Sequence, residues 1–330
     1  MPHDAAAGRY LQDMQEKYGG RLICNQQLAD LTWLRVGGPA EWLFQPGSLA
    51  ELQDFLANLP GTVPIFVLGA GSNLIVRDGG LAGVVIRLGK PFTTVSADNQ
   101  SVTAGAAMRV GRLACMAADR GLDLTFLRTI PGTVGGAVRM NAGCYGTYVS
   151  DCLTSATIVD RSGRRQEHPG EALGLGYRSS RIEADSIVIS ATFHCQTNTV
   201  ADLHRQMRSY NDRRAANQPT GVRTAGSTFR NPSGRSSSYD RRDRGLRTAW
   251  QVIDAAGLRG YRQGDAGVSE LHPNFLINHG SATGTQMEDL GEYIRTRVRQ
   301  SVGVDLVWEV DRVGMRPVAK GEPEPGGAVS

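Results

Sequence analysis

The feature that most restricts the fold is a glycine-rich loop with a strand-like run on each side. The apolar run Val63–Leu68 leads into Gly69–Asn73 (GAGSN), and a second apolar run, Leu74–Arg77, follows directly. A dinucleotide-binding Rossmann unit instead needs a helix that opens straight after its glycines, and a glycine where this chain has Leu74. The sequence therefore excludes a Rossmann unit. Consecutive N–H groups of such a loop can cradle a diphosphate, and an ordinary β-turn is the alternative.

A second glycine-rich loop, Ile130–Gly136 (IPGTVGG), leads into Ala137–Asn141 and Gly143. Two such loops, each after a regular element, suggest one extended cofactor held by the backbone at two points. Close packing of backbone against backbone is the alternative explanation.

Three polar residues are candidates for chemistry. Ser227 lies in Gly226–Pro232 (GSTFRNP), which lacks the GxSxG pattern of a nucleophile elbow. Two roles for Ser227 therefore stay open: a structural serine in a turn, or a proton donor. Arg178 follows Tyr177 in a GYRSS segment and could be a simple surface arginine. Glu309 lies in an apolar stretch, where a buried carboxylate needs a partner or acquires a raised pKa.

Periodicity and turn signals predict the remaining elements. A first helix is expected to end at about Tyr18, and a second to begin after Ser48, which can cap it with Glu51 three residues later. Further helices are expected over Val110–Ala118, Val200–Ala215, Ala249–Ala256 and Met287–Gln300. Strands are expected at Leu34–Ala40 before its glycine-proline turn, Trp42–Pro46, Val84–Leu88, Thr154–Asp160, Ser186–Phe193 and Val304–Val313. The serine- and arginine-rich segment Ser233–Thr248 reads as a mobile loop, and residues from Pro317 as a disordered tail.

Composition limits the location and the binding partners. No run approaches the roughly 20 apolar residues of a membrane span, and the polar N-terminus argues against a secretory signal. The five cysteines form no CxxC pair, which favours free thiols in a reducing cytoplasm and no metal site. Between Arg205 and Arg247, eleven arginines against three aspartates give a local net charge of +8. Few aromatic residues are interleaved there, so an anionic small molecule is favoured over nucleic acid, with a solvated loop as the alternative.

Taken together, the motifs resemble those of the MurB family, the UDP-N-acetylenolpyruvoylglucosamine reductases. Seven segments in order carry the resemblance: Leu34–Ala40 (LRVGGPA), Leu68–Val76 (LGAGSNLIV), Ile130–Gly143 (IPGTVGGAVRMNAG), Gly176–Ser179 (GYRS), Gly226–Pro232 (GSTFRNP), Val268–Asn278 (VSELHPNFLIN) and Trp308–Gly314 (WEVDRVG). The chain looks like the shorter, type II kind, because Tyr177–Phe193 leaves no room for the extra substrate loop of type I.

The resemblance implies an α+β fold: a two-subdomain FAD-binding fold of the p-cresol-methylhydroxylase type plus a C-terminal α+β substrate-binding domain. We expect FAD-binding subdomains at 1–90 and 91–197, the substrate-binding domain at 198–316 and a tail at 317–330. The implied cofactors are FAD and NADPH, and the implied substrate is a UDP-sugar. We expect a cytoplasmic monomer that neither inserts into a membrane nor binds nucleic acid.

In the implied reaction of peptidoglycan precursor synthesis, NADPH reduces FAD and leaves. Flavin N5 then delivers hydride to the enolpyruvyl group of the substrate, giving UDP-N-acetylmuramate. The family's proton-donating serine falls on Ser227, its carboxylate-polarising arginine on Arg178 and its active-site glutamate on Glu309.

The resemblance also implies two sets of binding residues. The expected FAD contacts are Arg35, Gly69, Ala70, Gly71, Ser72, Asn73, Leu74, Pro131, Gly132, Thr133, Gly135, Gly136, Asn141 and Gly143. The expected substrate contacts are Tyr177, Arg214, Arg230, Asn231, His272 and Asn274.

Two departures from the family pattern stand out: Arg230 replaces the usual lysine, and Ser233–Thr248 looks like an insertion. Two other functions are compatible with parts of the pattern. One is an oxidase or dehydrogenase on the same flavin fold, and the other is a non-catalytic sugar-nucleotide-binding protein. The combination of Arg178, Ser227 and Glu309 favours the reductase.

Overall fold

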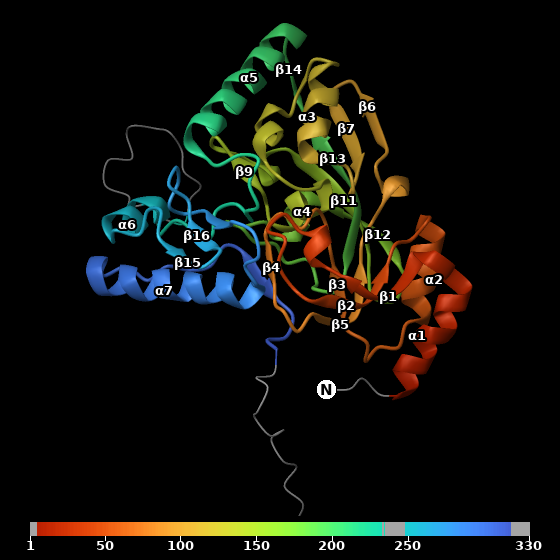
Figure 1. Cartoon of the computed structure of the whole chain (residues 1–330). Helices are drawn as coiled ribbons and strands as arrows, with labels where there is room; N and C mark the ends of the chain where they lie inside the picture. Colours follow the sequence, from red (N-terminus) through yellow and green to blue (C-terminus); the bar gives the residue numbers. More distant parts are fainter. Residues whose placement is uncertain (1–4, 233, 235–247, 318–330) are drawn as a thin grey trace, which may run out of the picture.

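The computed structural model describes residues 5–232, 234 and 248–317 of the 330, and they form three parts (Figure 1). Residues of all three parts line one cleft. Each part has its own sheet and its own helices, so the chain has the α+β class that the sequence predicts. Short 3₁₀ helices connect the elements: η1 Gly19–Arg21, η2 Ala29–Leu31, η3 Lys90–Phe92, η4 Thr125–Thr129, η5 Val149–Asp151 and η6 Gly170–Leu173.

The first part is a four-stranded sheet with two helices. Its strand order is β1-β2-β5-β3; β1 and β2 pair antiparallel, whereas β5 pairs parallel with β2 and with β3. Helices α1 and α2 share the apolar core of this sheet, where aromatic rings stack. The bounds are α1 Ala5–Tyr18, β1 Leu22–Gln27, β2 Pro39–Phe44, α2 Leu49–Asn58, β3 Ile65–Val67 and β5 Leu81–Ile86.

Helix α2 begins as its sequence predicts. The Ser48 side chain accepts a hydrogen bond from the Glu51 backbone N–H at 3.1 Å and so caps the helix. The Glu51 carboxylate, however, accepts from the N–H of Gly47 and from Arg21 rather than from Ser48.

The second part is a five-stranded antiparallel sheet of order β12-β11-β13-β7-β6. Helix α3 packs on it, and so does α5, because Leu203 and Met207 of α5 belong to the same apolar core (Figure 1). The bounds are β6 Val95–Asp98, β7 Ser101–Gly105, α3 Val110–Ala118, β11 Leu153–Val159, β12 Arg165–Pro169, β13 Ile187–His194 and α5 Val200–Asn217. Smaller elements at its edge are β8 Leu122–Asp123, α4 Val134–Arg139, β9 Gly143–Cys144, β10 Thr147–Tyr148 and β14 Gln196–Thr197.

The third part is a three-stranded sheet of order β15-β16-β17 that packs against α6 and α7. Gly257, with φ of +73°, follows α6 at the position where the sequence predicts that helix to stop. The bounds are α6 Ala249–Ala255, β15 Arg262–Gln263, β16 Ala266–Val268, β17 Leu276–Asn278 and α7 Gly284–Val302.

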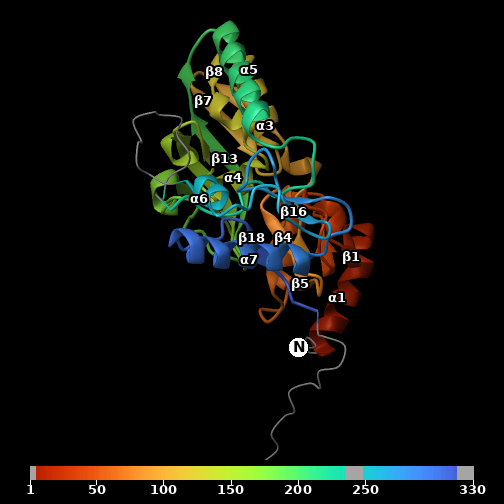
Figure 2. The same ribbon diagram turned by 60° about the vertical axis from the view of Figure 1, so that its left-hand side comes forward.

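The last strand of the chain crosses from the third part to the first. Strand β18 (Asp311–Val313) pairs parallel with β4 (Leu74–Val76), the strand that follows the first glycine loop (Figure 2). Residues more than 230 positions apart in sequence therefore lie side by side next to that loop.

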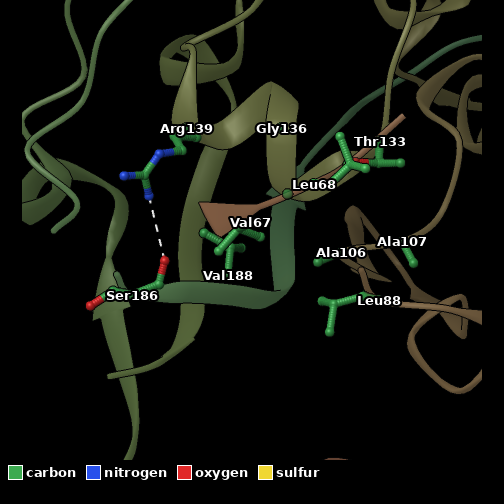
Figure 3. Close-up of a pocket in the computed structure, with 12 residues that line it drawn as sticks. Val67, Leu68, Leu88, Ala106, Ala107, Thr133, Gly136, Arg139, Ser186 and Val188 are labelled. Carbon is green, nitrogen blue, oxygen red and sulfur yellow. Dashed lines mark hydrogen bonds between the residues drawn. The ribbon is translucent and has the colours of Figure 1, made fainter. Parts of the chain in front are cut away.

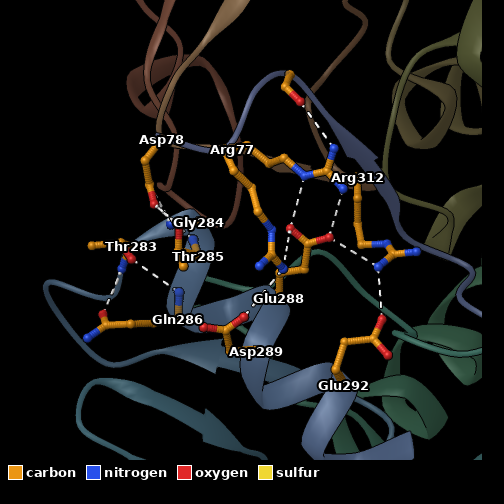
Figure 4. Close-up of polar contacts among 12 residues, drawn as sticks. Arg77, Asp78, Thr283, Gly284, Thr285, Gln286, Glu288, Asp289, Glu292 and Arg312 are labelled. Carbon is orange, nitrogen blue, oxygen red and sulfur yellow. Dashed lines mark hydrogen bonds and ion pairs between the residues drawn. The ribbon is translucent and has the colours of Figure 1, made fainter. Parts of the chain in front are cut away.

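Charged residues at this junction tie α7 to β4 (Figure 4). Asp78 accepts from the backbone N–H groups of Gly284 and Thr285 at 2.7 and 2.9 Å, which satisfies two free donors of the α7 N-terminus. The buried carboxylate of Glu288 bonds Arg77 with both oxygens and also bonds Arg312. A buried carboxylate needs such partners, so this network fixes the third part on the first.

Two predicted strands are wrong in position. The segment Leu34–Gly38 is not a strand, because Arg35 and Gly37 have φ of +57° and +112°, which an extended strand does not allow; pairing starts only at Pro39. The stretch Val304–Val310 contains only an isolated bridge between Trp308 and Phe229, and only Asp311–Val313 forms a strand. In addition, Gly135 and Gly136 belong to helix α4 rather than to a loop. The predicted mobile segment Ser233–Thr248 and the predicted tail lie almost entirely outside the described residues.

Candidate active site

The first glycine loop has a conformation that requires glycine. Gly71 has φ of +64°, and a Cβ atom there would lie 2.5 Å from the carbonyl oxygen of Leu31. The carbonyl of Gly71 in turn accepts from the N–H of Trp33 at 2.9 Å. The segment Leu31–Trp33 therefore holds the loop from behind, while the side of the loop at Gly69 is exposed.

The second glycine-rich segment faces the first. A Cβ atom on Gly69 would lie 3.0 Å from the Thr133 hydroxyl, and one on Gly132, which has φ of +125°, would lie 3.4 Å from the Ser72 hydroxyl. The two loops thus approach each other with only backbone and small side chains between them. Side chains on these glycines would fill the space that separates the loops.

A cleft of about 310 Å³ opens between the loops and extends to the third part. It continues into a smaller, mainly apolar pocket of about 70 Å³, lined by Val67, Leu88 and Val188 among others (Figure 3). Arg139 lies in the wall of both and hydrogen-bonds the carbonyl oxygens of Glu183 and Ser186. A glycine-rich cleft that continues into an apolar pocket suits a flavin dinucleotide, whose diphosphate can be bound by backbone N–H groups.

Arg178 and Glu309 form an ion pair in the wall of the cleft. Arg178 donates from Nε to Glu309 Oε1 at 2.7 Å, and the two side chains are only 16% and 12% exposed. The Arg178 Nη2 approaches the carbonyl of Gly143, whereas its buried Nη1 has no partner among the described residues. One buried donor of a fixed cation in the cleft wall is therefore left without a partner, which suits an anionic ligand.

The backbone at Arg178 is held in an unusual conformation. Its φ is +53°, inside a tight turn in which Gly176 and Ser179 bond each other's backbone. The side chain of Asn141 supports this turn by donating to the carbonyl of Gly176 at 3.0 Å. A left-handed conformation at a non-glycine residue costs free energy, so the surrounding contacts must maintain it.

Ser227 lines the same cleft, on a backbone segment that pairs with the one bearing Glu309. The Glu309 N–H donates to the carbonyl of Thr228 at 2.8 Å, and Arg230 N–H donates to the carbonyl of Val307 at 2.8 Å. Asn274 fixes the serine segment from the other side, because its amide accepts from Phe229 N–H and donates to Phe229 O. Ser227, half-buried, thereby lines the cleft with Arg178 and Glu309.

The electrostatics of the cleft are dominated by buried charges. Burial raises the pKa of the Glu309 carboxyl, and the charges of Arg178 and Arg230 oppose that rise. Burial lowers the pKa of Arg214, a cleft arginine near Cys144 and Tyr145. Burial also raises the pKa of the Cys144 thiol, so this cleft cysteine is not an activated nucleophile.

Most of the residues expected to bind FAD line the two cavities. The larger cleft is lined by Gly69, Ala70, Gly71, Ser72, Asn73, Leu74, Pro131, Gly132, Thr133, Gly136 and Gly143, and Gly135 lines the smaller pocket. Arg35 and Asn141 line neither: Arg35 is exposed and bonds the carbonyl of Asp30, and Asn141 supports the Arg178 turn.

Of the residues expected to bind substrate, Arg214 lines the cleft, whereas Tyr177, Arg230, Asn231, His272 and Asn274 do not. Tyr177 lies against the Arg178 guanidinium, and Asn231 accepts from the N–H of Ala249 at the start of α6. His272 packs edge-on against Phe275, and burial lowers its pKa to about 4.

Sequence reasoning did not select three charged or reactive residues of the cleft, namely Arg139, Cys144 and Asp311. All three lie inside or next to the recognised motifs, and this closeness is the sequence feature that could have identified them. Burial raises the pKa of the Asp311 carboxyl, against the charges of Arg230 and Arg139.

Two features that would suggest other functions are missing from the described ranges. No group of three or more histidine, cysteine or acidic residues there could hold a metal ion. Over the same part of the chain, none of the helices has the length and apolar character needed to cross a membrane.

Two family models match the chain. Residues 40–168 match an FAD binding domain, and residues 218–313 match the C-terminal domain of UDP-N-acetylenolpyruvoylglucosamine reductase.

Several relatives carry that reductase name. The reductase of Paracoccus denitrificans is 55% identical over 295 residues, which span 89% of this chain and 96% of the relative. The reductase of Cereibacter sphaeroides is 53% identical over 301 residues, spanning 91% of this chain and 98% of the relative. Among solved structures, the UDP-N-acetylenolpyruvylglucosamine reductase of Thermus caldophilus matches with a TM-score of 0.74 and 32% identity, over 88% of this chain and 97% of that one.

Proposed function

The chain belongs to the family of UDP-N-acetylenolpyruvoylglucosamine reductases, and from that premise we propose how its residues carry out the reduction in peptidoglycan synthesis. The enzyme is an FAD-dependent, NADP-linked oxidoreductase. Its proposed substrate is UDP-N-acetyl-3-O-(1-carboxyvinyl)-glucosamine, and its product is UDP-N-acetylmuramate. The observation that carries the proposal is the Arg178–Glu309 ion pair beside Ser227, in a cleft that begins at two facing glycine loops.

The glycine loops supply the cofactor site in this proposal. The segment Gly69–Asn73 would hold the FAD diphosphate through backbone N–H groups, and Pro131–Gly136 would border the cofactor from the other wall. The chemistry that FAD supplies when bound is the transfer of two electrons from NADPH to the double bond of the substrate. We assign 1–90 and 91–197 to FAD binding and 198–316 to the substrate.

Arg178 would bind the substrate carboxylate through its free Nη1 donor. When hydride reaches the terminal vinyl carbon, negative charge moves onto the adjoining carbon and its carboxylate, so a fixed cation stabilises the transition state more than the ground state. Glu309 holds the Arg178 guanidinium in place through the 2.7 Å bond to Nε. The donor edge can then point at substrate without reorganisation.

Ser227 would donate the proton to the carbon that carries the developing charge. The carbon of an enolate is basic enough to take a proton from a hydroxyl, so no histidine or carboxylate base has to activate the serine. The position of its backbone is set by the Thr228–Glu309 hydrogen bond and by Asn274. The monomeric state, the cytoplasmic location and the predicted substrate contacts remain predictions; these contacts are Tyr177, Arg214, Arg230, Asn231, His272 and Asn274.

The visible spectrum of the purified, anaerobic protein tests the proposal directly. We expect NADPH to bleach the flavin absorbance, and subsequent addition of the enolpyruvyl nucleotide to restore it. Bleaching without recovery would instead indicate a flavoprotein of this fold with another oxidant. A colourless protein that FAD cannot reconstitute would refute the proposed function.

A further inference from the structure

Arg230 has a backbone fixed on two sides but a guanidinium outside the cleft. Its N–H donates to the carbonyl of Val307 at 2.8 Å, and the preceding Phe229 ring packs on Trp308 with ring centroids 5.0 Å apart. The residue is half-buried, and it does not line the cleft. Any effect of Arg230 on the reaction must therefore pass through its neighbours.

The first neighbour is the backbone of Arg178. Arg230 Nη2 approaches the carbonyl oxygen of Arg178 at 3.5 Å, so Arg230 lies behind the residue that has φ of +53°. Arg230 Nε is buried and has no hydrogen-bond partner in the described part of the chain. Such an incompletely bonded buried donor is costly, which argues that the position of the guanidinium serves a purpose other than stability.

The second neighbour is the carboxylate of Glu309. It faces two cations, Arg178 and Arg230, from two different segments, together with the phenol of Tyr177. The carboxylate of Asp311, two residues further along, interacts with Arg230 and with Arg139 on α4. The charge of Arg230 therefore acts on both carboxyls, Glu309 and Asp311, whereas the ion pair that Glu309 forms is with Arg178.

We propose that Arg230 is a positioning residue for the reduction: it holds the Arg178 carbonyl and places a second cation behind Glu309. Glu309 then stays charged and keeps its bond to Arg178 Nε, which leaves Arg178 Nη1 directed at the substrate carboxylate. This role rests on the proposed function, and it differs from a direct substrate contact. It also explains how an arginine can work where the resemblance leads us to expect lysine, because both supply a charge, and arginine adds further donors.

Three variants of the FAD-loaded enzyme test the role. Arg230→Met removes the charge and the donors, whereas Arg230→Lys keeps a charge and a single donor group. Arg213→Met is the matched control, since Arg213 is an exposed arginine of α5 that lines neither cavity. Glu309→Gln identifies the Glu309 signal in the spectra described next.

The first measurement needs no turnover. The carboxyl carbons of ¹³C-labelled glutamate are followed by NMR through a pH titration of each variant. We expect the midpoint of Glu309 to rise by about one pH unit in Arg230→Met, because an adjacent opposite charge lowers a carboxyl pKa by about that much or more. In Arg230→Lys the Glu309 midpoint should lie close to its wild-type value, because the charge is kept. In Arg213→Met it should not change.

The second measurement is the rate at which the enolpyruvyl nucleotide restores the flavin absorbance, as a function of pH. In Arg230→Met the acid limb of this profile should move up by the same amount as the NMR midpoint, while bleaching by NADPH keeps its wild-type rate. An unchanged Glu309 midpoint in Arg230→Met would overturn the proposal. So would a loss of rate that is equal at every pH and is not restored by lysine.

The two proposals can fail separately. If the wild-type flavin is not reoxidised by the enolpyruvyl nucleotide at any pH, the proposed function is wrong. The NMR titration would still report whether Arg230 controls the charge of Glu309.

Discussion

Ser227 is the residue whose replacement separates the two halves of the proposed reaction. In Ser227→Ala, NADPH should bleach the flavin at the wild-type rate, because the hydroxyl plays no part in that step. Recovery of the absorbance with the enolpyruvyl nucleotide should slow by about 10²–10⁴-fold, the usual contribution of a positioned proton donor. Stopped-flow absorbance on one sample measures both rates, so the first step is the control for the second. Recovery at the wild-type rate would remove Ser227 from the mechanism.

Motifs in the sequence were sufficient to select Ser227, Arg178 and Glu309, and all three line one cleft. They were not sufficient to select Arg139 or Asp311, because the importance of these side chains arises from a charge interaction between residues more than 170 positions apart. Asn274 shows that a residue inside a family motif can also have a structural role. Its motif suggests a substrate contact, yet both ends of its amide bond the backbone of Phe229.

Helix α7 depends on a close contact at its first residue. A Cβ atom on Gly284 would lie 2.3 Å from the carbonyl oxygen of Val76 and 3.1 Å from Asp78 Oδ1. Gly284→Ala should therefore push α7 away from β4 and destabilise the fold by about 1–3 kcal/mol. It should also weaken FAD binding, since β4 begins where the first glycine loop ends. Thermal unfolding and flavin fluorescence titration measure the two effects.

Gly8→Ala is the matched control for this substitution. Gly8 lies within α1, and a Cβ atom there would have no neighbour within 4 Å. Alanine is a better helix former than glycine, so this variant should be as stable as wild type or up to about 1 kcal/mol more stable. Equal stability of Gly284→Ala and Gly8→Ala would contradict the predicted clash.

The elements that the sequence predicted well have a continuous local pattern. Helices α3, α5 and α7 show regular apolar spacing, and α2 begins at a recognisable cap. The elements that it predicted poorly depend on distant partners. Burial alternates along part of Val304–Val310, as expected of a strand, since Leu306 and Val310 are buried and Val307 is exposed. However, that segment pairs with residues 228–230 and its continuation pairs with β4, which no local pattern can reveal.

At the scale of the whole molecule, the buried Glu288 carboxylate joins the third part to the first. Its hydrogen bond to Arg77 holds the pKa of Glu288 below its usual value, against the opposing effect of burial. A carboxyl with a lowered folded-state pKa contributes stability above its unfolded pKa of about 4.3, and this contribution is lost as pH falls through the folded pKa.

Glu288→Gln should therefore lower the free energy of unfolding at pH 7 by about 1–3 kcal/mol, because it leaves Arg77 without its charged partner and Arg312 with Glu292 alone. The difference from wild type should shrink as the pH falls below about 4, where the wild-type carboxyl also becomes neutral. Urea unfolding at a series of pH values measures this. Glu16→Gln, at an exposed position of α1, is the control for the chemical change itself. A constant difference at all pH values would rule out the charge as its cause.

The pairing of β18 with β4 has a consequence for how the enzyme is made in the cell. A ribosome has to add more than 230 further residues after β4 before the partner strand of β4 exists. Glu309, which lies two residues before β18, is translated equally late. A nascent chain stalled at Gly303 would carry both glycine loops but no Glu309, and would leave β4 without its β18 neighbour. The complete cleft can thus assemble only after Glu309 and β18 have been synthesised.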